Sequence, residues 1–441
     1  MNKTKLLTGI SALGACVMAI SANDQVAPAA PPTPNASTPL EAFTKGKPIF
    51  ELRARYETVD QARTKTLTNQ AAAYTLRTHI GFETATFHHV QVLVEGANVL
   101  SIGAGDFAVN VPGAAMPPLN GAGQAKYPLV NDPSNTRLNC AQITWIPIKA
   151  FSLTAGRQRL ITDDQRFVGN VNWRQDEQTF DAVRADLQVG KFKLFGAYLN
   201  HINRVLGEYR NFDSTSTLLN GRYDVTKTLS VEAFAYLLDF SNSAINSSQT
   251  EGVRVYGKFD YKPLKLAYSA TYARQSTYAN APTPFGLNFY SADVAATYRF
   301  ATVKLNYEEL DGNGVRGFTT PLATTHSFQG WSDAFVSPCG NKSFIDGIRD
   351  YNAALTIRPA IKPLTYFSKP EFIIWYHDFD DQLRGSNIGQ ELDISGSASV
   401  TKNIVLLVKY ADFKRSFTTP VGAATPPASR NKFWVSLEFK L

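Results

Sequence analysis

The sequence predicts an all-β fold: a transmembrane antiparallel β-barrel of about eighteen strands, with short periplasmic turns and long extracellular loops. Three observations predict it. Segments of about ten residues alternate apolar and polar side chains, so each strand has one apolar and one polar face. The connections between these segments alternate between long and short. A signal-like N-terminus precedes them, and no later apolar run is long enough for a spanning helix.

The N-terminus has the organisation of a secretory signal peptide, which we assign to residues 1–22. Lys3 and Lys5 supply the positive charge, and Leu6–Ile20 is apolar but too short to span a bilayer as a helix. Small residues up to Ala22 provide a cleavage site. The chain is therefore expected to be exported.

Residues 13–16 also resemble a lipoprotein cleavage box, but the apolar run continues beyond Cys16, which favours ordinary cleavage. Residues 23–47 are rich in Pro and Ala, and we expect a flexible periplasmic tail there. Residues 48–441 are predicted to form the barrel.

The first predicted strand shows the alternation clearly, because Phe50, Leu52 and Ala54 alternate with Glu51, Arg53 and Arg55. The same pattern recurs up to the last residue. The predicted strands are approximately 48–59, 72–84, 87–97, 136–146, 150–160, 179–190, 192–203, 212–224, 228–239, 251–261, 264–275, 287–300, 301–311, 347–358, 370–379, 387–399, 403–414 and 430–441.

The connections between the predicted strands divide into short turns and long loops, which alternate along the chain. A barrel in the outer membrane explains this division, because its periplasmic turns are short and its outer loops are long. One predicted short turn, 359–369, is stretched. The long connections are 60–71, 98–135, 161–178, 204–211, 240–250, 276–286, 312–346, 380–386 and 415–429.

In such a barrel the apolar set faces lipid and the polar set faces a lumen wide enough for water and solute. By this alternation Arg53, Arg55 and Arg77 face the lumen. The guanidinium group binds carboxylates bidentately, and water in a pore keeps each contact weak. These three arginines are therefore candidate anion-binding residues.

The stretch from 156 to 186, GRQRLITDDQRFVGNVNWRQDEQTFDAVRAD, has no apolar period and is dense in Arg, Asp, Gln and aromatic residues. It resembles the bacterial alginate-export family of outer-membrane barrels, and the segments FELRARY and LRTHIGFE look similar too. The resemblance implies an eighteen-stranded barrel that passes an anionic uronate polymer or a related solute through an Arg-lined pore. It assigns the pore role to Arg157, Arg159, Arg166 and Arg174.

Asp163, Asp164 and Asp176 lie in the same stretch. We expect them to pair with those arginines or to repel misplaced anions, in a gating or charge-pairing role. Two features depart from the family pattern: the long Pro/Ala tail, and a final Leu441 where such barrels usually end in Phe.

The leading hypothesis is a passive outer-membrane channel for anionic polysaccharide or uronate oligosaccharides such as alginate. A general or anion-selective diffusion porin for small-solute uptake is the first alternative. A barrel enzyme is a weaker one, because the sequence lacks G-x-S-x-G and H-E-x-x-H motifs. Adhesion through loops 98–135 and 312–346 is a third, and those loops are equally suited to folding inward.

No cluster of residues predicts a metal or another cofactor. The net charge is +7, but no Lys/Arg-rich run of the kind used by nucleic-acid binders is present. The expected partners are an anionic sugar, outer-membrane lipid and lipopolysaccharide, and the barrel-assembly machinery. The expected location is the outer membrane of a Gram-negative bacterium.

Overall fold

The computed structural model of the chain describes residues 35–103, 105–109, 126–207, 210–336, 342–360, 367–416 and 422–441. Eighteen long strands dominate it, accompanied by two strands of two residues each, β1 (Asn35–Ala36) and β4 (Thr86–Phe87). The helical elements are α1 (Pro39–Thr44), η2 (Ala244–Asn246) and η3 (Thr325–Ser327). No helix in the described ranges is long and apolar enough to cross a membrane.

The eighteen long strands coincide with the eighteen that the alternation predicts, and most ends agree within three residues. They are β2 (Lys47–Gln61), β3 (Ala71–Glu83), β5 (Val90–Ser101), β6 (Asn135–Ile148), β7 (Phe151–Gln158), β8 (Thr179–Val189), β9 (Phe192–Asn203), β10 (Phe212–Asp224), β11 (Ser230–Leu238), β12 (Ser248–Tyr261), β13 (Leu264–Ser276), β14 (Gly286–Tyr298), β15 (Ala301–Leu310), β16 (Ile348–Ile357), β17 (Ser368–Asp380), β18 (Asn387–Ser399), β19 (Ile404–Arg415) and β20 (Arg430–Lys440).

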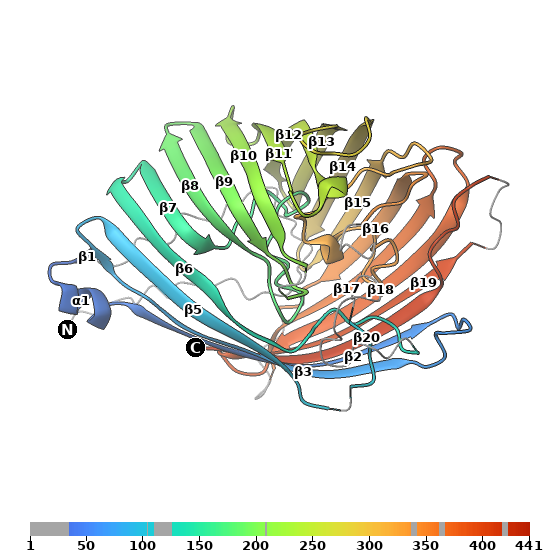
Figure 1. Cartoon of the computed structure of the whole chain (residues 1–441), viewed down its shortest axis with the longest axis horizontal. Helices are drawn as coiled ribbons and strands as arrows, with labels where there is room; N and C mark the ends of the chain where they lie inside the picture. The colour runs from blue at the N-terminus through green and yellow to red at the C-terminus, as the bar shows by residue number, and fades with distance from the viewer. Residues whose placement is uncertain are drawn as a thin grey trace.

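The strands form one closed antiparallel barrel. Each long strand pairs with its sequence neighbours, and the ring closes where β20 pairs with β2, for example Leu437 opposite Ala54. Figure 1 shows the red β20 returning beside the blue β2. Closure leaves no sheet edge, so neighbouring strands pair their backbone groups all around the ring, as a hydrocarbon environment requires. The predicted fold class is confirmed.

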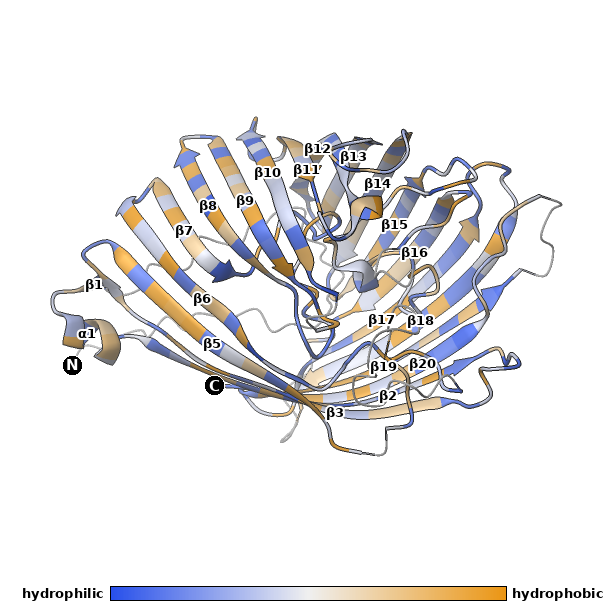
Figure 2. Cartoon of the chain, viewed as in Figure 1, coloured by the Kyte–Doolittle hydropathy of each residue, from blue (hydrophilic) through white to orange (hydrophobic). Residues whose placement is uncertain are grey.

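The two faces of each strand differ as the alternation requires. In β3, Ile80 is 61% exposed, whereas Arg77 and His79 are buried. Because successive side chains point to opposite faces of a sheet, the apolar set lies on the outer surface and the charged set inside. Figure 2 shows the resulting hydrophobic and hydrophilic stripes that cross the strands.

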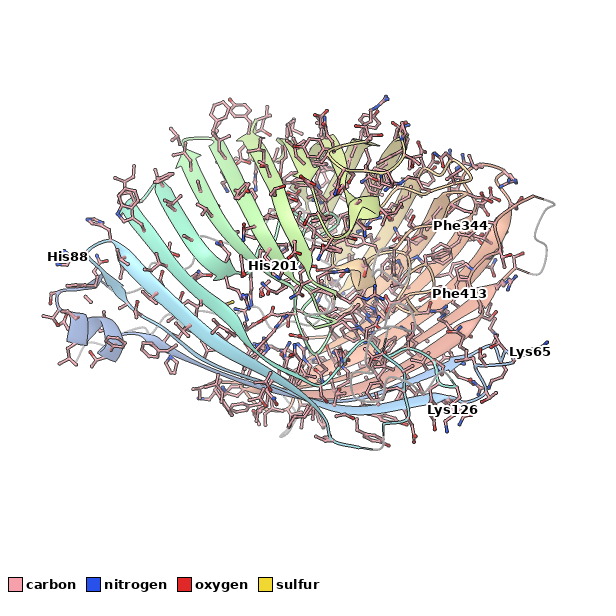
Figure 3. All side chains as sticks on the ribbon, in the orientation of Figure 1. Lys65, His88, Lys126, His201, Phe344 and Phe413 are labelled. Atoms are coloured by element: carbon pink, nitrogen blue, oxygen red, sulfur yellow. The ribbon has the colours of Figure 1, made fainter. Side chains whose placement is uncertain are left out.

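Short turns gather at one end of the barrel and long loops at the other. Figure 3 places His88, in the turn between β4 and β5, at the opposite end of the molecule from Lys65 and Lys126 of the long loops. Two long loops turn inward and fill part of the interior. Their apolar residues, among them Phe167, Val168 and Leu322, join inward-facing wall residues in one buried cluster.

The chain before the barrel is partly described. Residues 35–46, which belong to the range predicted as a tail, include β1 and α1, and β1 pairs in parallel with β4. The assignment of residues 1–22 to a signal peptide falls on residues outside the described ranges and stays a prediction. Cys140 is buried as a free thiol in the wall.

Candidate channel constriction

The loop between β7 and β8, residues 159–178, crosses the interior of the barrel, and we call it the inner loop. Its contacts extend from β2 to β15, on widely separated parts of the wall. It also pairs with the loop between β15 and β16, residues 311–347, which we call the second loop. Val168 forms a parallel bridge with Leu322, and Gly169 N–H donates to the Leu322 carbonyl over 2.8 Å.

An aromatic anchor explains why the inner loop turns inward. The ring of Phe167 lies 5.0 Å from that of Phe234 on β11 and 5.3 Å from that of Phe289 on β14. The loop reaches this position through left-handed backbone at Gln165 and Val171, with φ of 68° and 54°. That conformation is costly for a β-branched residue such as Val171, so the surrounding contacts must maintain it.

Arg53 and Arg77 project from neighbouring strands and hold the middle of the inner loop. Arg53 Nη1 donates to the Asn172 carbonyl over 2.8 Å, and Arg77 Nη1 donates to Asn172 Oδ1 over 2.6 Å. Both guanidinium groups also reach Glu438 Oε1 over 3.1 Å. Both arginines are buried. In this arrangement the loop supplies some of the oxygen acceptors of these cations, and strand carboxylates supply the others.

Arg174 and Arg55 also attach the inner loop to the wall of the barrel. Arg174 Nη1 lies 3.0 Å from Glu57 Oε2 on β2 and 3.4 Å from Asp132 Oδ2. Arg55 lies 3.9 Å from the same Asp132 oxygen, and its guanidinium carbon stands 4.3 Å from the centre of the Trp173 ring. A cation over an aromatic face is attracted by the ring quadrupole. Trp173 and Arg174 thus fasten one side of the loop to β2.

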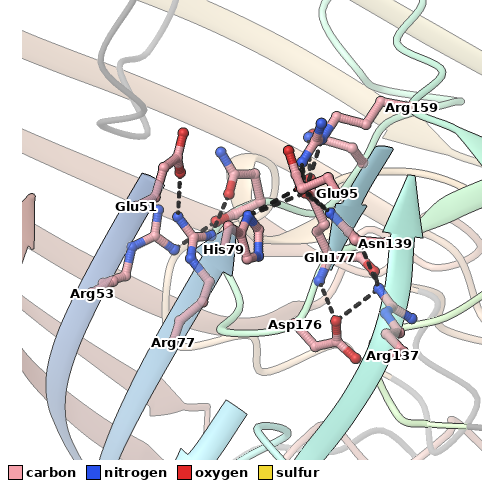
Figure 4. A network of polar contacts seen from close by, with 12 residues as sticks. Glu51, Arg53, Arg77, His79, Glu95, Arg137, Asn139, Arg159, Asp176 and Glu177 are labelled. Atoms are coloured by element: carbon pink, nitrogen blue, oxygen red, sulfur yellow. Dashed lines mark hydrogen bonds and ion pairs between the residues drawn. The ribbon is translucent and has the colours of Figure 1, made fainter. Parts of the chain in front are cut away.

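Arg159 and Glu177 close the base of the loop (Figure 4). Arg159 makes ion pairs with Glu177 and with Glu95 on β5. Asn139 Nδ2 on β6 donates to both carboxylates over 2.7 Å. Burial raises the pKa of Glu177, but the neighbouring groups that lower it, Arg159 first and Arg77 among them, together outweigh burial and hold the pKa below its usual range. Glu177 is therefore a carboxylate in the closed arrangement.

The same base contains a histidine. His79 Nδ1 lies 3.3 Å from Glu95 Oε1 and 3.9 Å from Glu177 Oε1, and the ligand atoms of the three residues lie within 4.8 Å of one another. Arg159 and Asn139 already donate to both carboxylates. We therefore assign the three residues to the ion-pair network that fixes the loop.

Asp176 is held on the other side of this base. Arg137 of β6 lies 2.7 Å from Asp176 Oδ1, and Asn135 Nδ2 donates to Asp176 Oδ2 over 2.9 Å. Burial raises the pKa of Asp176 from 3.8 to about 6, although Arg137 opposes the rise. The docked loop therefore retains a proton-binding group that titrates close to neutral pH.

Arg166 and Asp164 attach the tip of the loop to the far wall. Arg166 donates from Nε and Nη2 to Glu308 of β15 over 2.8 Å and 3.0 Å, a bidentate pair. Asp164 Oδ2 lies 3.1 Å from Arg254 Nη2 of β12. Asp163 lies near Glu232 of β11. Burial and that carboxylate raise the pKa of Asp163 well above its usual value.

Arg157 is placed differently from the prediction. It donates from Nε to Asp181 Oδ1 over 2.7 Å, and Asp181 lies on the face of β8 opposite the buried Phe180 and Ala182. The pair is therefore on the outer surface of the wall. The two arginines of the GRQR motif lie on either side of the last residue of β7. Arg157 is still in the strand, whereas Arg159 follows its end and turns inward.

The aspartates also have other partners than those expected. The sequence predicts that Asp163, Asp164 and Asp176 pair with the arginines or repel misplaced anions. Asp164 pairs with Arg254 and Asp176 with Arg137, both from the wall. The carboxylates that neutralise the loop arginines come mainly from strands. Sequence reasoning missed two of these, Glu95 and Glu308, although alternation within their strands marks them as inward-facing. It also missed Glu438, which pairs with the strand arginines Arg53 and Arg77.

The second loop is fixed by a cluster around Asp333. Lys432 and His326 Nδ1 lie 3.1 Å and 3.0 Å from Asp333 Oδ2. His326 stacks on Trp173 of the inner loop with ring centres 4.3 Å apart, and its Nε2 lies 2.8 Å from Lys409 Nζ. Burial and Lys409 hold the pKa of His326 well below its usual value, so this ring is neutral. The two loops therefore form one packed unit.

Lys258 and Lys265 are inward-facing cations that the loops do not use. Lys258 shares the inner face of β12 with the buried Arg254 and Tyr256, and Lys265 lies opposite Asp260 near the next short turn. Both are exposed, and neither makes an ion pair with a residue that the structure describes. They are thus free to meet a solute at the short-turn end.

The Alginate export family model matches residues 49–317, more than half of the chain. The chain belongs to the alginate export family. This membership confirms the resemblance seen in the sequence, and together with the closed barrel it identifies an outer-membrane β-barrel channel. None of the curated proteins matches it in sequence.

Solved structures share the fold of this alginate export family barrel at low identity. Pseudomonas aeruginosa OccK9 (OpdG) matches with a TM-score of 0.68 and 12% identity, covering 91% of this chain and 100% of that chain. Acinetobacter baumannii OccAB3 matches with a TM-score of 0.67 and 13% identity, covering 90% and 100%. P. aeruginosa OpdK, solved with vanillate, matches with 0.66 and 11%, covering 90% and 99%.

Proposed function

We propose that the barrel is a passive channel for anionic polysaccharide or uronate oligosaccharides, alginate among them. The observation that supports this proposal is that the buried, inward-facing Arg53 and Arg77 bind oxygen acceptors of the inner loop. A uronate carboxylate offers charged oxygen acceptors in place of these neutral ones, and the guanidinium fork binds them bidentately. Membership in the alginate export family supports this class of solute.

In the proposed mechanism the inner loop is the gate. While it is docked, Asn172 supplies the acceptors for Arg53 and Arg77, and Glu177 neutralises Arg159. When it moves away, these guanidinium groups face the lumen and are available to successive carboxylates of a chain. Many weak, hydrated contacts permit conduction, whereas a single tight site would stop it.

Lys258 and Lys265 are proposed to gather anions at the short-turn end. Both are exposed and make no ion pair with a described residue, and their two positive charges exceed the single charge of Asp260 on the same face. A charged, water-filled entrance concentrates solutes of opposite sign before they reach the constriction. Export and uptake both use such an entrance, since flux through a passive channel follows the solute gradient.

Planar-bilayer recording of the purified protein tests the proposal. The parent channel is expected to prefer anions, and Lys258→Gln with Lys265→Gln is expected to lower that preference. Arg157→Gln is the matched control, since it also removes cationic charge but lies on the outer face with Asp181. A parent channel that prefers cations, or a double variant with unchanged selectivity, would contradict the proposal.

A second candidate is uptake of small carboxylates. It is favoured by the two inward loops, which share one packed core within the barrel and so narrow it. One structure of similar fold, OpdK, was solved with vanillate, a small carboxylate. Liposome swelling with a single uronate sugar and with longer uronate oligosaccharides separates the candidates: passage of the single sugar alone favours this one.

A further inference from the structure

Helix α1 is attached to the short-turn end of the barrel. Thr38 Oγ1 accepts from Glu41 N–H over 3.1 Å and begins the helix, and Pro39 occupies its first position. Ala42 is buried, and its carbonyl accepts from the Ala85 N–H in the turn after β3 over 2.8 Å. Figure 1 shows α1 at the outer margin of the molecule, beside the start of β2.

The helix has an apolar and a polar side. Leu40 is 72% exposed and Phe43 is 62% exposed, one helical turn apart. Glu41 and Lys45 form an i,i+4 ion pair of 2.9 Å on another side. Apart from a stacking contact between Phe43 and Phe82, the apolar side is uncovered in the described part of the chain.

The apolar side lies over the lipid-facing surface of the wall. Phe43 stacks on Phe82 with ring centres 6.1 Å apart and planes at 19°. Phe82 shares its face of β3 with the exposed Ile80, and is therefore on the outer surface. Gly46 passes so close that a Cβ there would lie 2.4 Å from the Phe82 ring. The chain leaving α1 thus enters β2 beside the Phe82 ring.

This apolar side continues the aromatic belt of the barrel. Barrels in membranes carry rings of aromatic residues where strands meet the lipid headgroups. At the short-turn end, exposed aromatic residues follow one another around the wall, and Phe43 and Phe82 extend this series: Trp145, Phe192, Tyr261, Tyr298, Phe300 and Phe372.

We propose that α1 is an interfacial anchor whose Leu40 and Phe43 side chains insert into the phospholipid leaflet at the short-turn end. The occupant of the uncovered apolar side is lipid, because that side is continuous with the lipid-facing surface through the Phe43–Phe82 stack. Glu41 and Lys45 then face the headgroups and water. The anchor holds the start of β2, where the barrel closes against β20.

Spin labelling tests the anchor in the full-length barrel, reconstituted in phospholipid vesicles. Cys339 is first replaced by Ser, and the buried Cys140 is left in place. A nitroxide is attached at Leu40→Cys, and its collision rates with oxygen and with a nickel chelate are measured. We expect strong oxygen and weak nickel relaxation, as for a label at the lipid-facing Ile80→Cys.

Lys45→Cys is the matched control on the polar side of the same helix. Its label is expected to collide with the nickel chelate at least several-fold more often than the label at Leu40. Equal nickel accessibility at the two positions would overturn the proposal. Because both positions are exposed, neither label disturbs the barrel, and retained heat-modifiable migration in gels verifies folding of each variant.

A second measurement does not depend on a label at Leu40. Leu40→Ser with Phe43→Ser removes the apolar side while Thr38 and Ala42 keep the helix capped and attached. A label at Lys45→Cys is then expected to gain mobility in vesicles relative to the same label with Leu40 and Phe43 present. An unchanged spectrum would also overturn the anchor.

Discussion

Arg53, Arg77 and Arg174 illustrate how a buried charge can fasten a loop. Each guanidinium lies near strand carboxylates and contacts the inner loop or belongs to it. Removing one member of a buried pair is strongly destabilising, because the remaining charge loses its partner and does not regain water. The network therefore favours the docked loop as long as every member is present.

Glu177 is the member whose removal we expect to release the loop most directly. Glu177→Gln removes the negative charge beside Arg159 and leaves Glu95 as the carboxylate partner of that arginine. It also leaves one amide oxygen where two carboxylate oxygens accept from the Asn139 and Asn170 amides. We expect docking to weaken by about 2 kcal/mol, in line with the loss of one partner of a partly buried pair. Single-channel recording should show longer open periods.

Glu371→Gln is the control for this change. Glu371 pairs with Arg358 at the short-turn end, away from the inner loop. Both substitutions remove one carboxylate charge that faces an arginine, so a general charge effect would appear in both. Equal lengthening of the open periods in the two variants would contradict the role of Glu177.

The pH dependence of docking follows from Asp176. Its pKa is raised from 3.8 to about 6 by burial, so the docked loop binds a proton that a released loop gives up. Docking is thus favoured at pH below about 4 and weakens as the pH rises to about 6, by up to about 3 kcal/mol for this shift. Channel recordings between pH 4 and about 7 should show open probability rising with pH.

Asp176→Asn tests whether that residue causes the trend. The amide keeps the shape and can still accept a hydrogen bond from Asn135, but it does not titrate. The rise in open probability between about pH 4 and 6 should flatten in this variant. A slope identical to that of the parent would assign the titration to another group.

At the scale of elements, the inner loop and the second loop behave as one unit. Trp173 stacks on His326, Thr324 Oγ1 donates to Gln165 Oε1 over 2.6 Å, and Val168 bridges Leu322. Loops on a protein surface normally move independently. Here their shared core gives a single docked state, so loosening either loop is expected to loosen both.

Leu322→Ala tests this coupling. Leu322 is fully buried in the core that contains Phe167, and truncating a buried leucine costs about 2–5 kcal/mol. We expect trypsin to cut faster after Arg166 and Arg174 of the inner loop, although the substitution is in the second loop. Leu383→Ala, at an exposed position beyond β17, is the control. Cleavage of the inner loop at the parental rate would show that the loops are independent.

At the scale of the whole molecule, the barrel is a closed wall in lipid, and the two inward loops fill part of its interior. The outer face needs apolar side chains because hydrocarbon cannot solvate charge. The inner face carries charges that pair with charged residues of the inward loops and with one another. Each strand therefore has one face in contact with lipid and one face in contact with charged groups of the interior. This difference explains why apolar and polar side chains alternate so regularly.

Ile374→Arg tests the lipid-facing assignment. Ile374 is exposed near the middle of β17, beside Ile394 of β18. An arginine on this face is expected to lower the free energy of unfolding by about 2–4 kcal/mol near the bilayer midplane. Reversible urea unfolding in phospholipid vesicles measures it. Ile374→Ala removes the same side chain without adding charge, so a comparable loss there would refute the assignment.

Much of the wall was predictable from local pattern. Alternation located all eighteen long strands, since a membrane imposes a two-residue period on every strand regardless of its neighbours. It also placed Arg53, Arg55 and Arg77 on the inner face, where they lie. The inward course of the inner loop was not predictable, because Phe167 meets Phe234 and Phe289 only after the barrel closes.

Arg157 and Arg159 show the limit of what the sequence pattern can predict. The GRQR motif predicts a pore position for both arginines. However, β7 ends between them, and Arg157 lies on the outer face with Asp181. The sequence by itself determined strand number, facing and family, because these depend on residues near each other in the chain. Only the tertiary structure decided which carboxylate pairs with which arginine, because those partners come from distant strands and meet across the lumen.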